Sequence, residues 1–249
     1  MFVIMTVIVH LMFPMLAYQP PRSSYSDEDS RVFKLTTRTG ASISAIHHKN
    51  PNAQYTVLYS HGNATDIGYA NGFMVMLRDA GFNVLAYDYQ GYGTSESRPS
   101  EKRSYDDINA AYHYLTEILM IPESSIILYG SSIGTGPTMD LATRTEPGGV
   151  ILESPMLSAY RVMTQLPIFP FDKYKNADKL SAVQAPLLII YGEKDRTIPP
   201  WHGKHLFKKA LGLKFILPVP GAGHNDLFAE ASGDIMEKIK EFAAAIASS

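Results

Sequence analysis

Residues 130–134 read Gly-Ser-Ser-Ile-Gly, a match to the pattern G-x-S-x-G. They follow an apolar run typical of a buried strand, Ile126 to Tyr129, and precede a segment with a helical pattern. A sharp turn between strand and helix is the setting in which a serine nucleophile is held exposed. The alternative is a serine that caps a helix in an ordinary strand-to-helix turn of a nucleotide-binding sheet. The strand, the turn and both glycines together favour Ser132 as a nucleophile.

A serine hydroxyl becomes a good nucleophile only when a base takes its proton. His224 is the candidate base, because it lies in a glycine-rich loop between the last expected strand and the last expected helix. Asp195 follows the preceding strand and is expected to orient the imidazole, with Glu193 as the second choice. Asp226 is too close to His224 along the chain to bond its ring, and we expect it to bond loop amides instead.

Acyl transfer also requires hydrogen-bond donors for the oxyanion that forms on the substrate. One donor is expected to be the backbone N–H of Ile133, the residue after the nucleophile. The second is assigned to the backbone N–H of Asn63, within the His-Gly-Asn-Ala segment that follows the third expected strand. A plain strand-to-helix turn is the simpler interpretation of that segment.

The composition excludes several other classes of function. The formal net charge is −2 and the chain has no cysteine, so nucleic acid is not an expected partner and thiolate chemistry is absent. His47 with His48, and His202 with His205, lack a third ligand at suitable spacing for zinc. Neither a dinucleotide-binding fingerprint nor a P-loop occurs. We therefore expect neither a metal nor a cofactor.

Alternating strands and helices are needed to position these residues. A hairpin at 32–38 and 42–48 is followed by strands at 55–60, 83–87, 125–129, 149–152, 187–191 and 214–219, with helices at 66–80, 100–121, 132–145, 201–211 and 234–247. Continuous apolar strands separated by helices predict a mostly parallel eight-stranded sheet with helices on both faces, which is an α/β class. The expected organisation is an apolar segment and linker at 1–30 and one domain at 31–249.

Residues 155–181 interrupt the alternation and are rich in proline, aromatic residues and methionine. We expect a small lid-like insertion here. Its apolar side chains either contact the acyl chain of a substrate or simply cover the core. The set is Met156, Leu157, Met163, Leu166, Ile168, Phe169 and Phe171, with Met156, Leu157, Met163 and Phe169 as the substrate-binding candidates.

The first residues form an unusually apolar segment, in which Thr6 and His10 are the only polar residues between Phe2 and Tyr18. As a helix it would reach roughly 25 Å, which is shorter than a hydrocarbon core of about 30 Å. Three interpretations compete: a short membrane anchor, a signal segment, and a buried or partner-facing helix. Membrane association through residues 2–17 is favoured over a soluble or secreted protein.

Several longer runs resemble one family, the α/β-hydrolase domain 17 proteins, which are protein depalmitoylases, and their fungal and plant relatives. The matching runs are L-A-Y-Q-P-P from Leu16, S-H-G-N-A from Ser60, Y-D-Y-Q-G-Y-G from Tyr87, I-L-Y-G-S-S-I-G-T from Ile127, F-D-K-Y-K-N from Phe171 and G-A-G-H-N-D from Gly221. The resemblance implies an α/β-hydrolase fold and thioesterase activity on S-acylated proteins. It also implies the catalytic roles of Ser132, Asp195 and His224.

The chain departs from that family at its first residues. Animal depalmitoylases of the family carry an N-terminal cysteine cluster that is acylated, whereas this chain contains no cysteine. The expected function is hydrolysis of esters or thioesters of acyl chains through an acyl-serine intermediate, including palmitoyl-protein thioesters. The alternatives are an amide hydrolase similar to serine aminopeptidases and a catalytically silent binding module.

Overall fold

Eight strands form one sheet in the computed structural model, which describes residues 17–164 and 171–248 apart from the side chain of Met163. The strand order is β1-β2-β4-β3-β5-β6-β7-β8. The first two strands form an antiparallel hairpin, β2 pairs antiparallel with β4, and the remaining pairs are parallel. The predicted mostly parallel sheet of the α/β-hydrolase class is therefore confirmed. The strands are β1 (Val32–Thr36), β2 (Ser42–His48), β3 (Thr56–Ser60), β4 (Asn83–Tyr87), β5 (Ile126–Ser131), β6 (Gly149–Glu153), β7 (Leu187–Gly192) and β8 (Lys214–Val219).

Apolar side chains cover both faces of the central strands, and this explains their continuous apolar sequences. Every residue of β3, β5, β6 and β7 is buried, whereas the edge strand β8 is mostly half-buried. A parallel strand packed on both faces has no polar side to show to water, so the alternating pattern of a half-exposed strand is missing.

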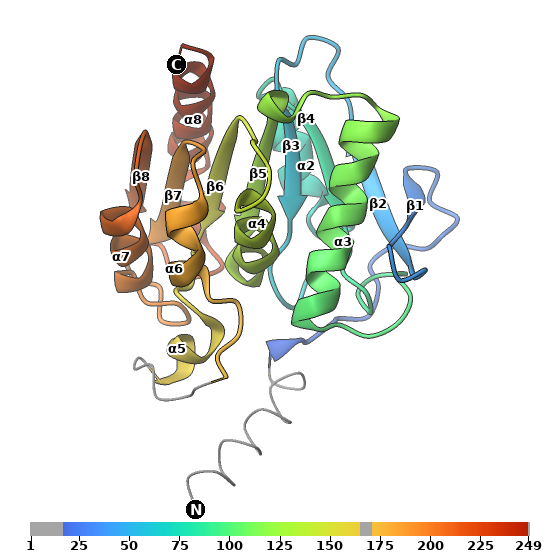
Figure 1. The fold of residues 1–249 in the computed structure, drawn as a ribbon, viewed down its shortest axis with the longest axis horizontal. Helices are drawn as coiled ribbons and strands as arrows, with labels where there is room; N and C mark the ends of the chain where they lie inside the picture. The colour runs from blue at the N-terminus through green and yellow to red at the C-terminus, as the bar shows by residue number, and fades with distance from the viewer. Residues whose placement is uncertain (1–16, 165–170, 249) are drawn as a thin grey trace, which may run out of the picture.

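Helices lie on both faces of the sheet, as Figure 1 shows. The buried side chains of α2 (Asn71–Asp79) and α8 (Leu227–Ala247) belong to one core cluster, and those of α3 (Glu101–His113), α4 (Thr135–Ala142) and α7 (Trp201–Lys209) to the other. After α3 the chain continues as a π-helical turn, η1 (Tyr114–Ile118), so the single helix expected at 100–121 changes its hydrogen bonding near its end.

Two helices begin at different places from those predicted. The α2 helix begins at Asn71 rather than at Asp66, because the Asp66 carboxylate accepts a hydrogen bond from the Tyr69 N–H (2.9 Å) and holds a separate turn. The α8 helix begins at Leu227 rather than at 234, and Ala231 within it has non-helical backbone angles. Leu227, its first residue, is buried in the same core cluster as the other buried residues of the helix.

The insertion between β6 and β7 carries two short helices, α5 (Ala159–Thr164) and α6 (Asn176–Lys179), and a turn of 3-10 helix, η4 (Leu180–Ala182). Figure 1 shows α5 at the same end of the sheet as the first described residues of the chain. Within residues 17–164 and 171–248, no helix combines the length and the apolar composition needed to cross a bilayer. The apolar segment proposed for membrane association, apart from Ala17, lies outside the described residues.

The central strand β5 provides a test of the core. Leu128 is fully buried there, so Leu128→Ala is expected to lower the free energy of unfolding by about 2–5 kcal/mol through lost burial and a cavity. Leu211 is 64% exposed, and Leu211→Ala is expected to change it by less than about 0.5 kcal/mol. Denaturant unfolding measures both. Equal effects of the two variants would contradict the assigned core.

Candidate active site

Ser132 occupies a strained turn between β5 and the helical segment η3 (Ser132–Gly134) that leads into α4. Its φ angle is +52°, in the left-handed region that L-residues rarely adopt. The flanking glycines permit the close packing of this turn. A Cβ on Gly130 would lie 2.6 Å from the Gly134 carbonyl oxygen, and a Cβ on Gly134 would lie 2.1 Å from the Ser60 carbonyl oxygen. The turn expected from G-x-S-x-G is thus present, and only glycine fits on either side.

A chain of two hydrogen bonds connects Ser132, His224 and Asp195. The Ser132 Oγ lies 3.0 Å from the His224 Nε2, and the His224 Nδ1 lies 2.7 Å from the Asp195 Oδ2. A carboxylate at Nδ1 favours the tautomer that carries its proton there, which leaves Nε2 free to accept the serine proton. The backbone N–H groups of Thr197 and Ile198 donate to the other carboxylate oxygen at 2.9 and 2.8 Å. The acid is therefore fixed in place as well as buried.

The three side chains meet because each follows a parallel strand at the same edge of the sheet. Ser132 follows β5, Asp195 follows β7 and His224 follows β8, and the carboxyl ends of parallel strands are where α/β sheets form their sites. Glu193, the second choice for the acid, is exposed to solvent. The Asp226 Oδ1 accepts from the Gly223 N–H at 2.5 Å, so it supports the histidine loop as expected.

Both residues expected to bind an oxyanion, Asn63 and Ile133, line the cavity that contains Ser132 and His224. The Asn63 side-chain oxygen is held from two directions. It accepts from the Tyr92 hydroxyl at 2.6 Å and from the Gln19 N–H at 3.0 Å. The side-chain oxygen is therefore engaged in holding the loop, and the oxyanion role of the Asn63 backbone N–H stays a prediction.

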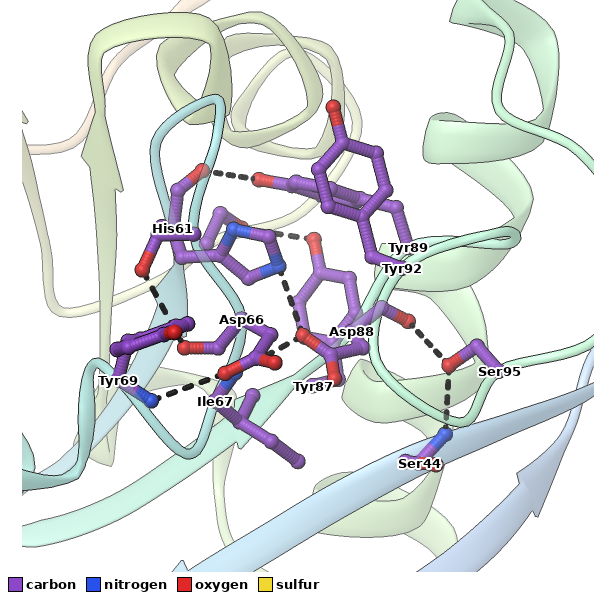
Figure 2. A network of polar contacts seen from close by, with 12 residues as sticks. Ser44, His61, Asp66, Ile67, Tyr69, Tyr87, Asp88, Tyr89, Tyr92 and Ser95 are labelled. Atoms are coloured by element: carbon purple, nitrogen blue, oxygen red, sulfur yellow. Dashed lines mark hydrogen bonds and ion pairs between the residues drawn. The ribbon is translucent and has the colours of Figure 1, made fainter. Parts of the chain in front are cut away.

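A buried histidine–aspartate contact lies under this loop, and sequence reasoning missed it. In Figure 2 the His61 ring lies between the loop and Asp88, with its Nε2 at 3.0 Å from the Asp88 Oδ1. Both side chains are completely buried. The His61 Nδ1 lies 2.7 Å from the Gly62 carbonyl oxygen, and the Tyr89 hydroxyl donates to the His61 carbonyl at 2.7 Å. The backbone carbonyl groups of His61 and Gly62 are thereby anchored.

The same Asp88 connects the loop to the N-terminal part of the described chain. Its Oδ1 also accepts from the Ile67 N–H at 3.0 Å, and its Oδ2 accepts from the Tyr25 hydroxyl. The Y-D-Y-Q-G-Y-G run was visible in the sequence, but a single sequence does not indicate that its aspartate contacts a histidine 27 positions earlier.

A cavity of about 680 Å³ opens beside Ser132. Of the four substrate-binding candidates, Met156 lines it, whereas Leu157 is fully buried in the core and is not among the lining residues. The side chain of Met163 and all of Leu166, Ile168 and Phe169 lie outside the described residues, and Phe171 is exposed. Apolar lining that sequence reasoning did not identify comes from Ala17, Tyr59, Ala159, Val162, Ile198, Leu227 and Phe228.

No cluster of three or more histidine, aspartate or glutamate side chains in the described part of the chain could hold a metal ion. At this edge of the sheet the structure brings together a serine hydroxyl, an imidazole and carboxyl groups.

The family model for serine aminopeptidases of type S33 matches residues 51–171. Among solved structures, an esterase from Pyrococcus furiosus superposes with a TM-score of 0.76 at 18% identity, covering 91% of this chain and 98% of that one. A bromoperoxidase from Bacillus anthracis superposes with a TM-score of 0.65 at 19% identity, covering 86% and 99%. At such low identity these two structures establish the fold.

Two relatives are much more similar in sequence. Alpha/beta hydrolase domain-containing protein 17B of Xenopus laevis is 43% identical over 226 residues, which cover 89% of this chain and 78% of that protein. The human 17B protein is 40% identical over 224 residues, covering 88% and 77%. The chain therefore belongs to the alpha/beta hydrolase domain-containing protein 17 family and is a serine hydrolase of the α/β-hydrolase type.

Proposed function

We propose that this protein hydrolyses acyl esters and thioesters through a covalent acyl-serine intermediate. The observation that carries the proposal is the hydrogen-bonded chain from Ser132 through His224 to Asp195, with distances of 3.0 and 2.7 Å, beside a cavity with apolar walls. A polar reaction centre next to an apolar cavity suits a substrate with a reactive carbonyl at the end of an alkyl chain.

In the acylation step the Ser132 oxygen attacks the substrate carbonyl carbon and its proton passes to the His224 Nε2. The backbone N–H groups of Asn63 and Ile133 bind the oxyanion that forms. His224 then donates this proton to the leaving alcohol or thiol as the bond to the acyl group breaks. In the second half water attacks the acyl-serine and His224 takes the water's proton. His224 then returns this proton to the Ser132 oxygen as the bond to the acyl group breaks, which releases the carboxylic acid and free Ser132.

The substrate class in this proposal is a long acyl chain, with S-palmitoylated proteins as the specific case. Support comes from the cavity walls, in which Met156, Ala159, Val162 and Phe228 are apolar. Further support is the resemblance of the motifs to protein depalmitoylases. A protein-linked thioester has its acyl chain on one side of the carbonyl and a large polar group on the other, so only the chain needs to enter the cavity.

Amide hydrolysis, as the serine aminopeptidase family model suggests, is the less favoured alternative. Residues 154–186 are all that separates β6 from β7, and those described form α5, α6 and η4. This segment is short for a cap domain that would enclose the terminus of a peptide substrate. A silent binding module is disfavoured because the hydrogen-bonded chain at Ser132 has the geometry of a working nucleophile and base.

A fluorophosphonate probe tests the nucleophile directly. We expect it to label the wild type and to leave Ser132→Ala unlabelled, with kcat on p-nitrophenyl esters reduced by about 10⁶-fold. Asp195→Asn is expected to reduce kcat by about 10⁴-fold, because the imidazole loses its oriented tautomer. Glu193→Gln, at the exposed neighbouring acid, is the matched control and should retain wild-type labelling. Labelling of Ser132→Ala at the wild-type rate would refute the assignment.

A chain-length series tests the acyl cavity. In Ala159→Phe the larger side chain fills part of the cavity and excludes about two methylene groups of the acyl chain from it. At about 0.8 kcal/mol for each methylene, this is expected to lower kcat/KM for palmitoyl thioesters roughly 10-fold. Acetyl esters should be affected far less. Ile118→Phe, at a 63% exposed residue of η1, is the control. A wild-type preference for acetyl or butyryl over long chains would count against the lipid-like substrate.

Residues 2–17 are proposed to bring the enzyme to membranes. The segment is almost entirely apolar, and Ala17, where the described chain begins, lines the active-site cavity. Deletion of residues 2–16 is expected to move the protein out of the pellet when it is sedimented with phosphatidylcholine vesicles, while short-chain esterase activity is retained. An unchanged bound fraction would rule this segment out as the anchor.

A further inference from the structure

Glu153 is a buried acid in the active-site cavity for which the mechanism above has no role. It is the last residue of β6, the strand between β5, which leads to Ser132, and β7, which leads to Asp195 (Figure 1). In the sheet register it stands opposite Ser131, the residue immediately before the nucleophile. It lines the same cavity as Ser132 and His224, although only 8% of the residue is exposed.

Two hydroxyl groups hold the Glu153 carboxyl. The Tyr129 hydroxyl donates to Oε2 at 2.5 Å and the Ser131 hydroxyl donates to Oε1 at 2.9 Å. Both donors come from β5, and both are matched to an ionised carboxylate, which only accepts hydrogen bonds. The Ser131 contact ties the acid to the turn that presents the nucleophile.

Three titratable groups interact electrostatically with Glu153: Tyr59 from β3, Tyr129 from β5 and His224 from the loop after β8. Burial raises the pKa of Glu153, and the hydrogen bonds from Tyr129 and Ser131 and the charge of His224 act against this rise. Within the described residues no cationic side chain forms an ion pair with Glu153. The buried charge therefore lacks a permanent counter-ion.

In the proposed mechanism His224 becomes a cation when it takes the proton of the nucleophile, and it is His224 that interacts electrostatically with this acid. We propose that Glu153 is a positioning residue, which holds Ser131 beside the nucleophile and adds a second negative charge to that of Asp195 when the His224 imidazolium forms. This inference rests on the proposed function. It follows the general rule that preorganised charges are most effective where charge develops during the reaction.

If Glu153 had a purely structural role, its replacement would lower the stability of the protein. The raised pKa of its carboxyl group predicts the opposite effect. A carboxyl whose pKa is raised by folding binds its proton more tightly in the folded state, so its contribution to stability is present at low pH and is lost as pH rises. Above that transition the buried charge opposes folding. Glu153→Gln, which keeps the shape and can still hydrogen-bond both hydroxyls, should therefore be at least as stable as the wild type at pH 8.

The test measures the rate of fluorophosphonate labelling and kcat/KM on one ester between pH 5 and 9. For Glu153→Gln we expect a drop of about 10-fold in both at neutral pH, equivalent to about 1.4 kcal/mol, with KM little changed. The acid limb of both profiles should move to lower pH, because the electrostatic interaction between Glu153 and His224 is lost. Glu193→Gln, the same change at an exposed acid, should leave the limb where it is.

A double variant adds a second measurement. In the Asp195→Asn background Glu153 still interacts electrostatically with His224, so Glu153→Gln is expected to lower the rate more there than in the wild type. Unchanged rates and an unchanged acid limb in a folded Glu153→Gln would overturn the inference. So would a loss of stability in that variant at pH 8, which would mark the residue as structural. Failure of the wild type to label or to cleave esters would instead count against the proposed function itself.

Discussion

The close approach between the nucleophile turn and the loop after β3 is the constraint on which the site depends. Gly134 packs against the carbonyl oxygen of Ser60 at a distance that admits no Cβ, and Ser132 is held at φ +52°. This contact brings the serine hydroxyl and the loop that contains Asn63 to the two sides of one cavity. A site of this kind requires its donors to be in place before the reaction, because their reorganisation would otherwise add to the barrier.

The loop that faces this turn is held by polar groups as well as by the apolar packing of Ile67. The His61–Asp88 pair is completely buried, and Asp88 also accepts from the Ile67 N–H and the Tyr25 hydroxyl. Burial of polar groups is costly unless they are hydrogen-bonded. Both carboxylate oxygens of Asp88 accept hydrogen bonds, and this favours one arrangement of the loop.

Two carboxyl groups adjoin the imidazole, and their surroundings differ. Asp195 is held by the N–H groups of Thr197 and Ile198 and bonds the His224 ring directly. Glu153 is held by two hydroxyls and reaches the histidine only through space. Different environments give carboxyl groups in one site different tasks. Here one fixes the orientation of the imidazole and the other, in our proposal, contributes charge.

The sequence by itself determined the strands, the mostly parallel sheet, the nucleophile turn and the chain order of serine, acid and histidine. These depend on local periodicity, on glycine spacing and on the fixed topology of a parallel sheet. Tertiary structure decided which neighbouring side chain faces the cavity: Asp195 rather than Glu193, Met156 rather than Leu157, and Glu153, which no motif marked. It also decided where α2 and α8 begin. The reason is geometric, since adjacent residues in a loop share composition and position along the chain, and only packing against distant strands selects which of them points inward.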